Sequence, residues 1–208
     1  PYTFGLQELS KNITIMSSKS AVAVDDTVYW MGIDSFYVYS GQTQQLPCTV
    51  KNKIFLDINL EQKDKVHAGV NSEYGEVIWF YPTASSTDID AYVIYNYIEN
   101  VWYYGTLARD AWLDRGIRTL PQATGSSYLY NHESGNDDDG SAMTSFIESA
   151  PMDIGDGHKF VSINRIIPDV SFKGSDTTTP TVSLTVKAKD FSGSNYDQTG
   201  SGTIERSA

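Results

Sequence analysis

The chain has 208 residues, of which 40% are hydrophobic and 12% aromatic, enough to form the core of one large domain or two small ones. Its 15 Lys and Arg are outnumbered by 26 Asp and Glu, so the formal net charge is −11. The hydrophobic content excludes a disordered chain, and the charge disfavours a surface that binds nucleic-acid phosphates.

The ends of the chain and its one cysteine limit the class of protein further. Cys48 cannot form an internal disulfide and is interpreted as a passive thiol. No apolar run approaches the roughly 20 residues of a membrane-spanning helix, and residues 1–4 do not resemble a signal peptide. We expect no membrane association. Because the chain begins without Met and ends in a polar stretch, we interpret it as a fragment of a longer protein.

Short aromatic runs separated by Gly, Asn, Asp and Ser predict many short strands and a mostly β fold. The first group contains residues 20–24, 27–33 and 36–39, joined by tight turns at Asp25-Asp26 and Asp34-Ser35. This spacing predicts a three-stranded meander. Before it, Phe4, Leu6, Leu9 and Ile13 could form a short turn of helix.

Residues 51–66 carry the best helical pattern of the chain. Phe55, Ile58, Gln62 and Val66 would share one face, and Asn52 could cap the start. The other face is charged, which predicts a short surface helix.

A second group of strands is predicted over residues 76–81, 91–98 and 101–105, and a weaker third one over residues 125–130. Similar strings recur in these groups at uneven spacings around the roughly 40–50 residues of a four-stranded propeller blade. We therefore interpret residues 1–150 as incomplete β-propeller blades formed by antiparallel meanders, with the helix near 51–66.

The pattern changes after Pro151. Residues 159–167 and 181–191 predict longer strands, and in the second Val182, Leu184, Val186 and Ala188 alternate with polar residues. Residues 174–180 form a predicted loop, and from Ser192 onward the sequence predicts an exposed or disordered tail. Residues 151–208 are thus expected to be a β-sandwich-like or sheet-rich segment with a flexible tail.

Two motifs could bind metal ions, but neither fits a known template. Asn136, Asp137, Asp138, Asp139 and Gly140 resemble part of a calcium loop. Placing Gly140 at the glycine position of an EF-hand puts Gly135 and Phe146 where carboxylates are required. A solvated acidic turn is the better interpretation, although a non-standard loop that uses Asp153 or Asp156 remains open.

The pair His132-Glu133 resembles the start of a zinc-protease motif, but the second histidine is replaced by Asn136. His67, His132 and His158 share no ligand spacing and are interpreted as ordinary turn or interface residues. We therefore expect no metal and no other cofactor.

No motif identifies a catalytic residue. Gly193-Ser194-Asn195 and Gly200-Ser201-Gly202 lie in the predicted tail, where no rigid scaffold would hold a catalytic triad. The sequence has no phosphate-binding glycine loop, and its 26 acidic residues offer too many pairs to identify a glycosidase site. No catalytic, cofactor-binding or metal-binding residue is nominated, and the chain is expected not to be an enzyme.

The aromatic runs could be platforms on which sugars or bases stack. The stronger interpretation is that these rings pack between sheets, because large rings bury much area and favour strands. Trp30 and Trp79 occupy matching places in the first two groups, and we expect both in the cores of blades.

Five strings go beyond these general patterns: residues 77–82 (VIWFYP), 92–102 (YVIYNYIENVW), 109–116 (RDAWLDRG), 129–135 (LYNHESG) and 153–157 (DIGDG). In this order they resemble the tail nozzle or tail tubular protein B family of short-tailed bacteriophages, which is related to packaged-DNA stabilisation proteins. The resemblance covers roughly residues 22–172.

The resemblance implies a structural virion protein that contains a β-propeller. Such a subunit forms a homo-oligomeric ring, implied to be a hexamer, below the portal and adaptor, in the conduit that retains the genome and passes it during ejection. It implies no catalytic residues. The expected partners are other tail proteins, namely adaptor, portal and fibres, and the expected location is the virion tail, assembled in the host bacterial cytoplasm.

The negative charge agrees with this expectation, because an acidic or neutral wall would let DNA slide through without specific binding. The alternative is a carbohydrate-binding or carbohydrate-processing β-propeller. A sugar site would need exposed aromatic faces beside carboxylates in one pocket, whereas an assembly protein would present apolar patches at its contacts.

Overall fold

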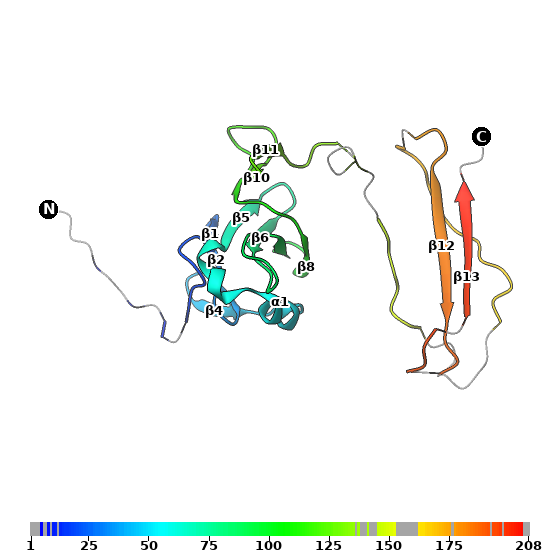
Figure 1. Cartoon of the computed structure of the whole chain (residues 1–208), viewed down its shortest axis with the longest axis horizontal. Coiled ribbons are helices and arrows are strands. Elements are labelled where there is room, and N and C mark those ends of the chain that lie inside the picture. The colour runs from blue at the N-terminus through cyan, green and yellow to red at the C-terminus, as the bar shows by residue number, and fades with distance from the viewer. Residues whose placement is uncertain are drawn as a thin grey trace. The chain divides into compact units, whose positions relative to one another are not determined.

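The structure is a computed structural model (Figure 1). It describes residues 5, 8, 10–11, 13–135, 137, 141, 145–152, 162–175, 177–191, 193–196 and 198–205. The chain divides into two compact units, Pro1–Met143 (unit 1) and Thr144–Ala208 (unit 2). The described residues form four antiparallel sheets and two short helices, which confirms the prediction of a mostly β fold.

The first sheet of unit 1 has four strands in chain order: β1 (Ala21–Val24), β2 (Thr27–Met31), β3 (Phe36–Tyr39) and β4 (Thr43–Leu46). The predicted three-stranded meander is confirmed, and β4 extends it. The sequence of β4, Thr-Gln-Gln-Leu, has little strand signal of its own. It is extended because it pairs with β3 along its whole length.

The helix predicted over residues 51–66 is two short helices, α1 (Lys51–Asp57) and the 3-10 helix η1 (Leu60–Lys65). Ile58, between them, is extended and forms a β-bridge with Thr83, which interrupts the helix. The predicted cap is also wrong: α1 begins after Val50, without a side-chain cap, and Asn59 caps η1 instead. On the predicted apolar face, Ile58 and Val66 are buried as expected.

The second sheet also has four strands in chain order: β5 (His67–Asn71), β6 (Glu76–Tyr81), β7 (Ala91–Asn96) and β8 (Val101–Thr106). The three predicted strands are confirmed to within two residues at their ends. β5 was not predicted, because His-Ala-Gly-Val-Asn has only one residue that favours strands. Its strand conformation follows from continuous pairing with β6.

The third sheet contains β9 (Ala111–Leu113), β10 (Gln122–Gly125) and β11 (Tyr128–Asn131), in the order β11-β10-β9. The weak unit predicted over residues 125–130 is the turn end of the β10–β11 hairpin. Ser126 and Ser127 both have positive φ, 49° and 68°, as a two-residue hairpin turn of the common type requires.

The first and second sheets pack face to face through a cluster that we call the first joint. Two aromatic pairs cross it, with ring centroids 4.9 Å apart for Phe36 and Trp79 and 4.6 Å for Phe36 and Trp102. Within the second sheet, the Tyr95 and Trp102 rings lie 4.8 Å apart beside them. The buried members are Met16, Met31, Phe36, Leu46, Ile54, Ile58, Val66, Val77, Trp79, Tyr81, Ala91, Val93 and Tyr95. This cluster is the main core of unit 1.

A smaller cluster, the second joint, covers the opposite face of the second sheet. Its buried members are Ile78, Phe80, Ile89 and Ile94, against which Tyr92, Leu107 and Trp112 pack. The ring of Trp112, from β9, lies over Gly69 of β5, where an added Cβ would come within 2.5 Å of the indole. Gly69 therefore permits the close approach of the third sheet, and the second sheet is covered on both faces.

The expectation for Trp79 is confirmed, since its side chain is fully buried in the first joint. The equivalent expectation for Trp30 is wrong. On β2, Tyr29 and Met31 face the first joint, so Trp30 points to the opposite face, because side chains alternate along a strand. Matching the two tryptophans in sequence shifted the register by one residue, which exchanges the two faces of a strand.

In unit 2, the β structure of the described residues is one hairpin, β12 (Thr181–Ala188) and β13 (Gln198–Glu205). β12 agrees with the first eight residues of the predicted strand 181–191. Of its predicted inward side chains, Val182, Val186 and Ala188 are half-buried, while Leu184 is exposed. This arrangement is sheet-rich and is not a sandwich within the described residues.

Two predictions for unit 2 are wrong. Residues 198–205, expected to be part of an exposed or disordered tail, form the strand β13, because pairing of backbone groups with β12 requires no apolar side chains. The strand predicted over residues 159–167 is not formed in residues 162–167, and residues 159–161 lie outside the described residues. The helical turn predicted at Phe4, Leu6 and Leu9 also lies outside them.

Candidate functional site

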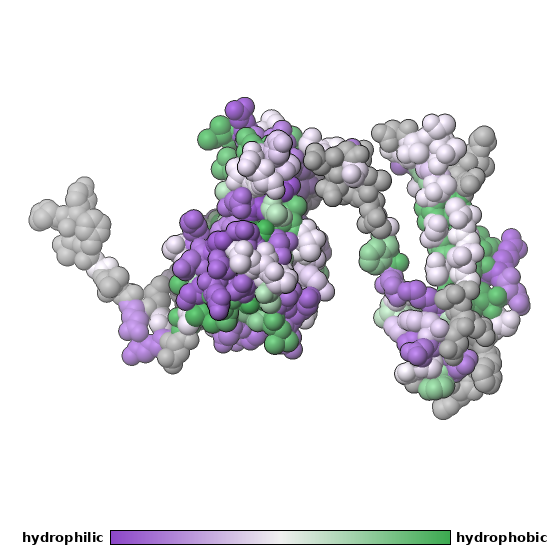
Figure 2. Space-filling model, viewed as in Figure 1, coloured by the Kyte–Doolittle hydropathy of each residue, from purple (hydrophilic) through white to green (hydrophobic). Residues whose placement is uncertain are grey.

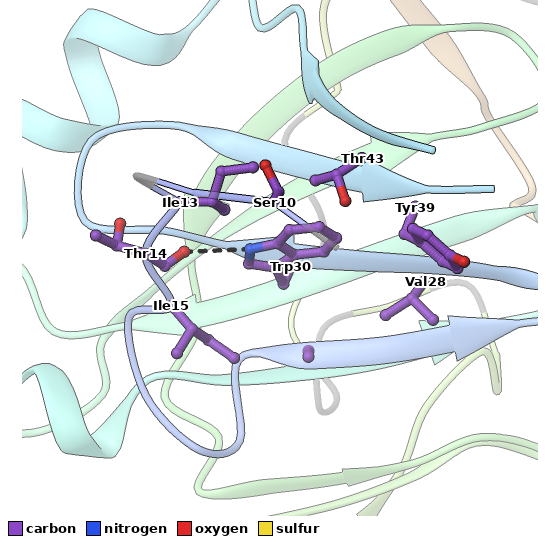
Figure 3. A pocket seen from close by; sticks show the side chains of 9 residues that line it. Ser10, Ile13, Thr14, Ile15, Val28, Trp30, Tyr39 and Thr43 are labelled. Atoms are coloured by element: carbon purple, nitrogen blue, oxygen red, sulfur yellow. Dashed lines mark hydrogen bonds between the residues drawn. The ribbon is translucent and has the colours of Figure 1, made fainter. Parts of the chain in front are cut away.

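An open groove of about 520 Å³ lies on the outer face of the first sheet, away from the first joint (Figure 3). The indole Nε1 of Trp30 donates to the Thr14 carbonyl oxygen at 3.2 Å, and its ring stacks on Tyr37 with centroids 5.5 Å apart. The lining residues are Ser10, Ile13, Thr14, Ile15, Ala21, Val28, Trp30, Tyr39 and Thr43.

The chemistry of this groove is that of stacking and apolar contact. None of its lining residues is charged. A carboxylate lies beside the groove at Asp34, which accepts a hydrogen bond from the Tyr37 hydroxyl at 3.3 Å. The groove can hold a flat or apolar group, and it has no general acid or base among its lining residues.

Two carboxylates approach one another at the end of the second sheet. Asn71 of β5 donates through Nδ2 to Glu76 Oε2 at 3.3 Å and to Glu133 Oε1 at 3.1 Å. The Tyr103 hydroxyl also donates to Glu76. Asn71 is 1% exposed, and its Oδ1 is buried without a partner among the described residues. A single amide therefore holds the two carboxylates near each other.

The two carboxylates differ in their electrostatic environment. Burial raises the pKa of Glu133, and the neighbouring carboxylates Glu76 and Glu73 raise it further, while the hydrogen bond from Asn71 lowers it. The pKa of Tyr103 is also raised, by burial and by Glu76, so its hydroxyl remains a donor at neutral pH. Glu76 and Glu133, joined by Asn71, form a polar contact between the second sheet and the residues that follow β11.

A second polar cluster surrounds His132. Arg109 Nε donates to His132 Nε2 at 2.9 Å, and the Arg109 guanidinium lies 3.9 Å from the centroid of the Tyr130 ring. The imidazole packs against the Trp112 ring with centroids 4.9 Å apart. Burial lowers the pKa of His132, and the positive charge of Arg109 lowers it further. This cluster holds β11 and Arg109 around the side chain of Trp112, which packs in the second joint.

His67, at the start of β5, lies at the same joint. Its ring is stacked on Phe80 with centroids 4.9 Å apart, and its Nδ1 lies 3.3 Å from the Lys65 carbonyl oxygen. Because a carbonyl oxygen can only accept, Nδ1 carries the proton, and Nε2 is buried with no partner among the described residues. Burial lowers the pKa of His67.

These positions do not bring the histidines together around a metal. Within the described part of the chain, no group of three or more His, Cys, Asp and Glu residues could hold an ion. His158, the acidic-turn residues Asn136 and Asp138 to Gly140, and the alternative ligands Asp153 and Asp156 lie outside the described residues. Of the predicted acidic turn, the structure describes Asp137 alone.

Cys48 packs against the first joint, and burial raises the pKa of its thiol to about 11. The thiol is therefore protonated at neutral pH. The two serines that stand next to glycines in the tail are not arranged as nucleophiles. The Ser194 hydroxyl donates to the Phe191 carbonyl oxygen at 2.9 Å, and Ser201 lies on β13 opposite Thr185.

Unit 2 contains a groove of about 640 Å³ that the sequence did not indicate. It lies between residues 162–168 and the hairpin, where Figure 2 shows hydrophobic residues along the strands. Its lining residues are Ser162, Ile163, Asn164, Arg165, Ile166, Pro168, Leu184, Val186, Ala188, Gly200, Ser201, Gly202, Thr203 and Ile204.

Comparison with known proteins adds no relative. The chain matches no protein-family model and no curated protein sequence. None of the helices in the described residues has the length and apolar character needed to span a bilayer.

Proposed function

We propose that the chain is a structural virion protein of a phage or prophage tail. In this role it forms part of the head-to-tail conduit that retains the genome and then passes it. It would assemble with adaptor, portal and fibre proteins, as a homo-oligomeric ring in the intact protein, without a cofactor and without specific binding of DNA.

One observation carries the proposal: the most deeply buried aromatic side chains, on β3 and β6, pack between sheets. Phe36, Trp79, Phe80 and Tyr81 are at most 2% exposed. Rings that contact one another in a sheet-to-sheet core supply mechanical cohesion, which a conduit subunit needs, and they are not accessible to a substrate.

The strings that resemble the tail family coincide with this architecture. Residues 77–82 contain most of β6, residues 92–102 run from β7 into β8, and residues 109–116 contain β9. Together they supply most of β6 and β7, the start of β8 and the strand of the third sheet that contacts the second. The first two sheets each have four antiparallel strands in chain order, as propeller blades do. These features support the family assignment as a proposal.

The distribution of charge supports a surface that does not hold DNA. Residues 66–108, which include the whole second sheet, contain five acidic residues and neither Lys nor Arg. Each phosphate contact made by a cation adds affinity and would slow the movement of DNA. A wall formed by this segment would repel the duplex.

The test is reconstitution of the full-length gene product with the portal and adaptor proteins encoded beside it, imaged in negative stain. The proposal predicts rings at the tail end of the portal, and a duplex DNA affinity weaker than micromolar at physiological salt. Absence of rings in the presence of both partners would overturn it, and so would specific micromolar binding of duplex DNA by the intact ring.

Carbohydrate binding is a second candidate, favoured by the groove around Trp30. The ring is half-buried and flanked by Tyr39 and by hydroxyls of Thr14 and Thr43. A glycan array would show retention that is lost in Trp30→Ala and kept in Tyr128→Ala, a variant of an exposed tyrosine outside the groove. Carbohydrate processing has less support, because the carboxylates Glu76 and Glu133 do not line this groove.

A further inference from the structure

Two histidines lie at or beside the second joint, His67 on the second sheet and His132 next to Trp112 of the third, and the hydrogen bonds of both require a neutral imidazole. At His132, the donor is Arg109, whose guanidinium keeps its protons in proteins, and the acceptor is Nε2. A proton on Nε2 would place two donors against each other beside a permanent positive charge. The Arg109 contact with the Tyr130 ring depends on the same placement of the guanidinium.

At His67, protonation would create a different defect. The Nδ1 proton is directed to the Lys65 carbonyl, so the added proton would go to Nε2, which is buried with no partner among the described residues. A buried N–H without an acceptor, on a charged ring that is 7% exposed, is costly. The ring is stacked on Phe80, which in turn contacts Trp112.

We infer that the second joint is an acid-sensitive contact: protonation of His67 and His132 releases the third sheet from the second, while the first joint stays closed. We expect both imidazoles to be protonated in the open joint, His67 because the sheet that packs over Phe80 has left, and His132 because its contacts with Arg109 and Trp112 are no longer held by the second sheet. Acid therefore favours the open joint and exposes Trp112, Phe80 and the backbone at Gly69. This inference does not depend on the proposed tail function.

Other charged groups also lie near the joint. They are Lys19 and Asp110 beside His67, Arg109 beside His132, and Glu73, Glu76, Asp114, Arg115 and Glu133 where β5 and β6 meet the third sheet. Glu133 acts in the opposite direction, because its pKa is raised in the closed joint and its protonation in acid relieves repulsion with Glu76. That effect opposes the histidines as the pH falls through the raised pKa of Glu133.

The direction of the pH effect on joint opening follows from proton binding. Both histidines have pKa values below the usual 6.5 in the closed joint. The open joint therefore binds more protons as the pH falls below about 6.5, and its population rises. Each histidine contributes at most about tenfold for each pH unit. Between pH 7.5 and pH 5.5 the two together can increase opening by up to about a hundredfold.

The indole N–H groups of the four tryptophans report on the two joints and on the outer face separately, because each donates to a backbone carbonyl. Trp112 Nε1 bonds the Val70 carbonyl across the second joint, at 2.7 Å. Trp79 and Trp102 bond the carbonyls of Ser20 and Pro47 at the first joint, and Trp30 bonds that of Thr14 on the outer face.

The experiment is NMR hydrogen exchange of the four indole protons in the full chain at pH 7.5 and pH 5.5, corrected for intrinsic exchange rates. We expect the protection of Trp112 to fall by tenfold or more at pH 5.5, while that of Trp79 and Trp102 stays constant. The double variant His67→Asn, His132→Gln replaces both imidazoles by neutral amides. The amide nitrogen at position 67 can donate in place of Nδ1, and the amide oxygen at position 132 can accept in place of Nε2. This variant should abolish the acid response of Trp112. His158→Asn in unit 2 is the matched control and should keep it.

Because the double variant removes the ring that stacks on Phe80, His132→Gln alone is the second variant, and it should remove part of the acid response. Unchanged protection of Trp112 at pH 5.5 would overturn the inference. Equal loss at all four indoles would also overturn it, since that pattern is global unfolding. Persistence of the acid response in the double variant would assign it to other groups and overturn the role of the histidines.

Discussion

The two joints of unit 1 cover the same second sheet from opposite sides, but they are built from different side chains. The first joint is a large cluster of aromatic and aliphatic groups in which the Trp79 N–H reaches the Ser20 carbonyl. The second has four buried hydrophobic side chains beside His67 and Asn71, which each leave one buried polar atom without a partner among the described residues. Apolar contacts are insensitive to pH, whereas the second joint depends on which groups are neutral.

This difference implies a division of roles. The first joint sets the stability of unit 1, because it buries the larger apolar area. The second joint is the weaker contact and the one that can respond to its surroundings. Variants of one joint should therefore leave the other largely unaffected.

The largest expected effect is that of Trp79→Ala. The side chain is fully buried and contacts both Phe36 and Trp102, so its removal leaves a large cavity in the first joint. Replacing a buried Trp by Ala costs about 3–5 kcal/mol, a large share of the stability of a domain of this size. Urea unfolding of the variant, followed by circular dichroism, measures the loss.

Trp30→Ala is the matched control, because sequence comparison treats the two tryptophans as equivalent and the structure does not. Trp30 is half-buried on the outer face, where it stacks on Tyr37. Its removal should cost about 1–2 kcal/mol, since only part of its surface is buried. Equal losses in the two variants would contradict the assignment of Trp30 to the outer face.

Gly69→Ala tests the second joint with an intermediate effect. The added Cβ would come within 2.5 Å of Trp112, so the indole must move and the third sheet must shift. Overpacking of this kind costs about 1–3 kcal/mol. Limited proteolysis should cut residues 115–120 faster in the variant, with the core of the first joint intact. Gly116→Ala, which meets nothing within 4 Å, should behave as the wild type.

Strands with their own aromatic and β-branched residues could be predicted from sequence. β2, β3, β6, β7, β8 and most of β12 have alternating or continuous runs of such residues, which favour extended structure. β4, β5 and β13 could not be predicted, since their polar or glycine-rich residues become strands only through pairing with a neighbour. The break at Ile58 has the same cause, because it depends on the bridge to Thr83.

The candidate sites were less accessible to sequence reasoning. Asn71 and Glu133 are 62 residues apart, and nothing in either local sequence predicts that they share a hydrogen bond. The pair His132-Glu133 resembles the start of a zinc motif in sequence, but in the structure the two side chains contact Arg109 and Asn71. Asn71 stands in a segment with little strand signal, so its burial and its hydrogen bonds follow only from the fold.

The smallest expected effect is that of Glu133→Gln, which changes the charge at the second joint and nothing at the first. The amide oxygen of Gln can still accept from Asn71, and the repulsion with Glu76 is removed. Because the pKa of Glu133 is raised on folding, its charged form destabilises the native state at neutral pH, and this penalty disappears as the pH falls through the raised pKa.

The variant should therefore be slightly more stable than the wild type at pH 7.5, by less than about 1 kcal/mol given the exposure of Glu133 to solvent. The difference should vanish near pH 4, where the wild-type carboxyl is also neutral. Thermal unfolding of both proteins across this pH range measures it. A stabilisation that persists at pH 4 would show that the gain comes from packing and not from charge, and would remove Glu133 from the pH-dependent part of the second joint.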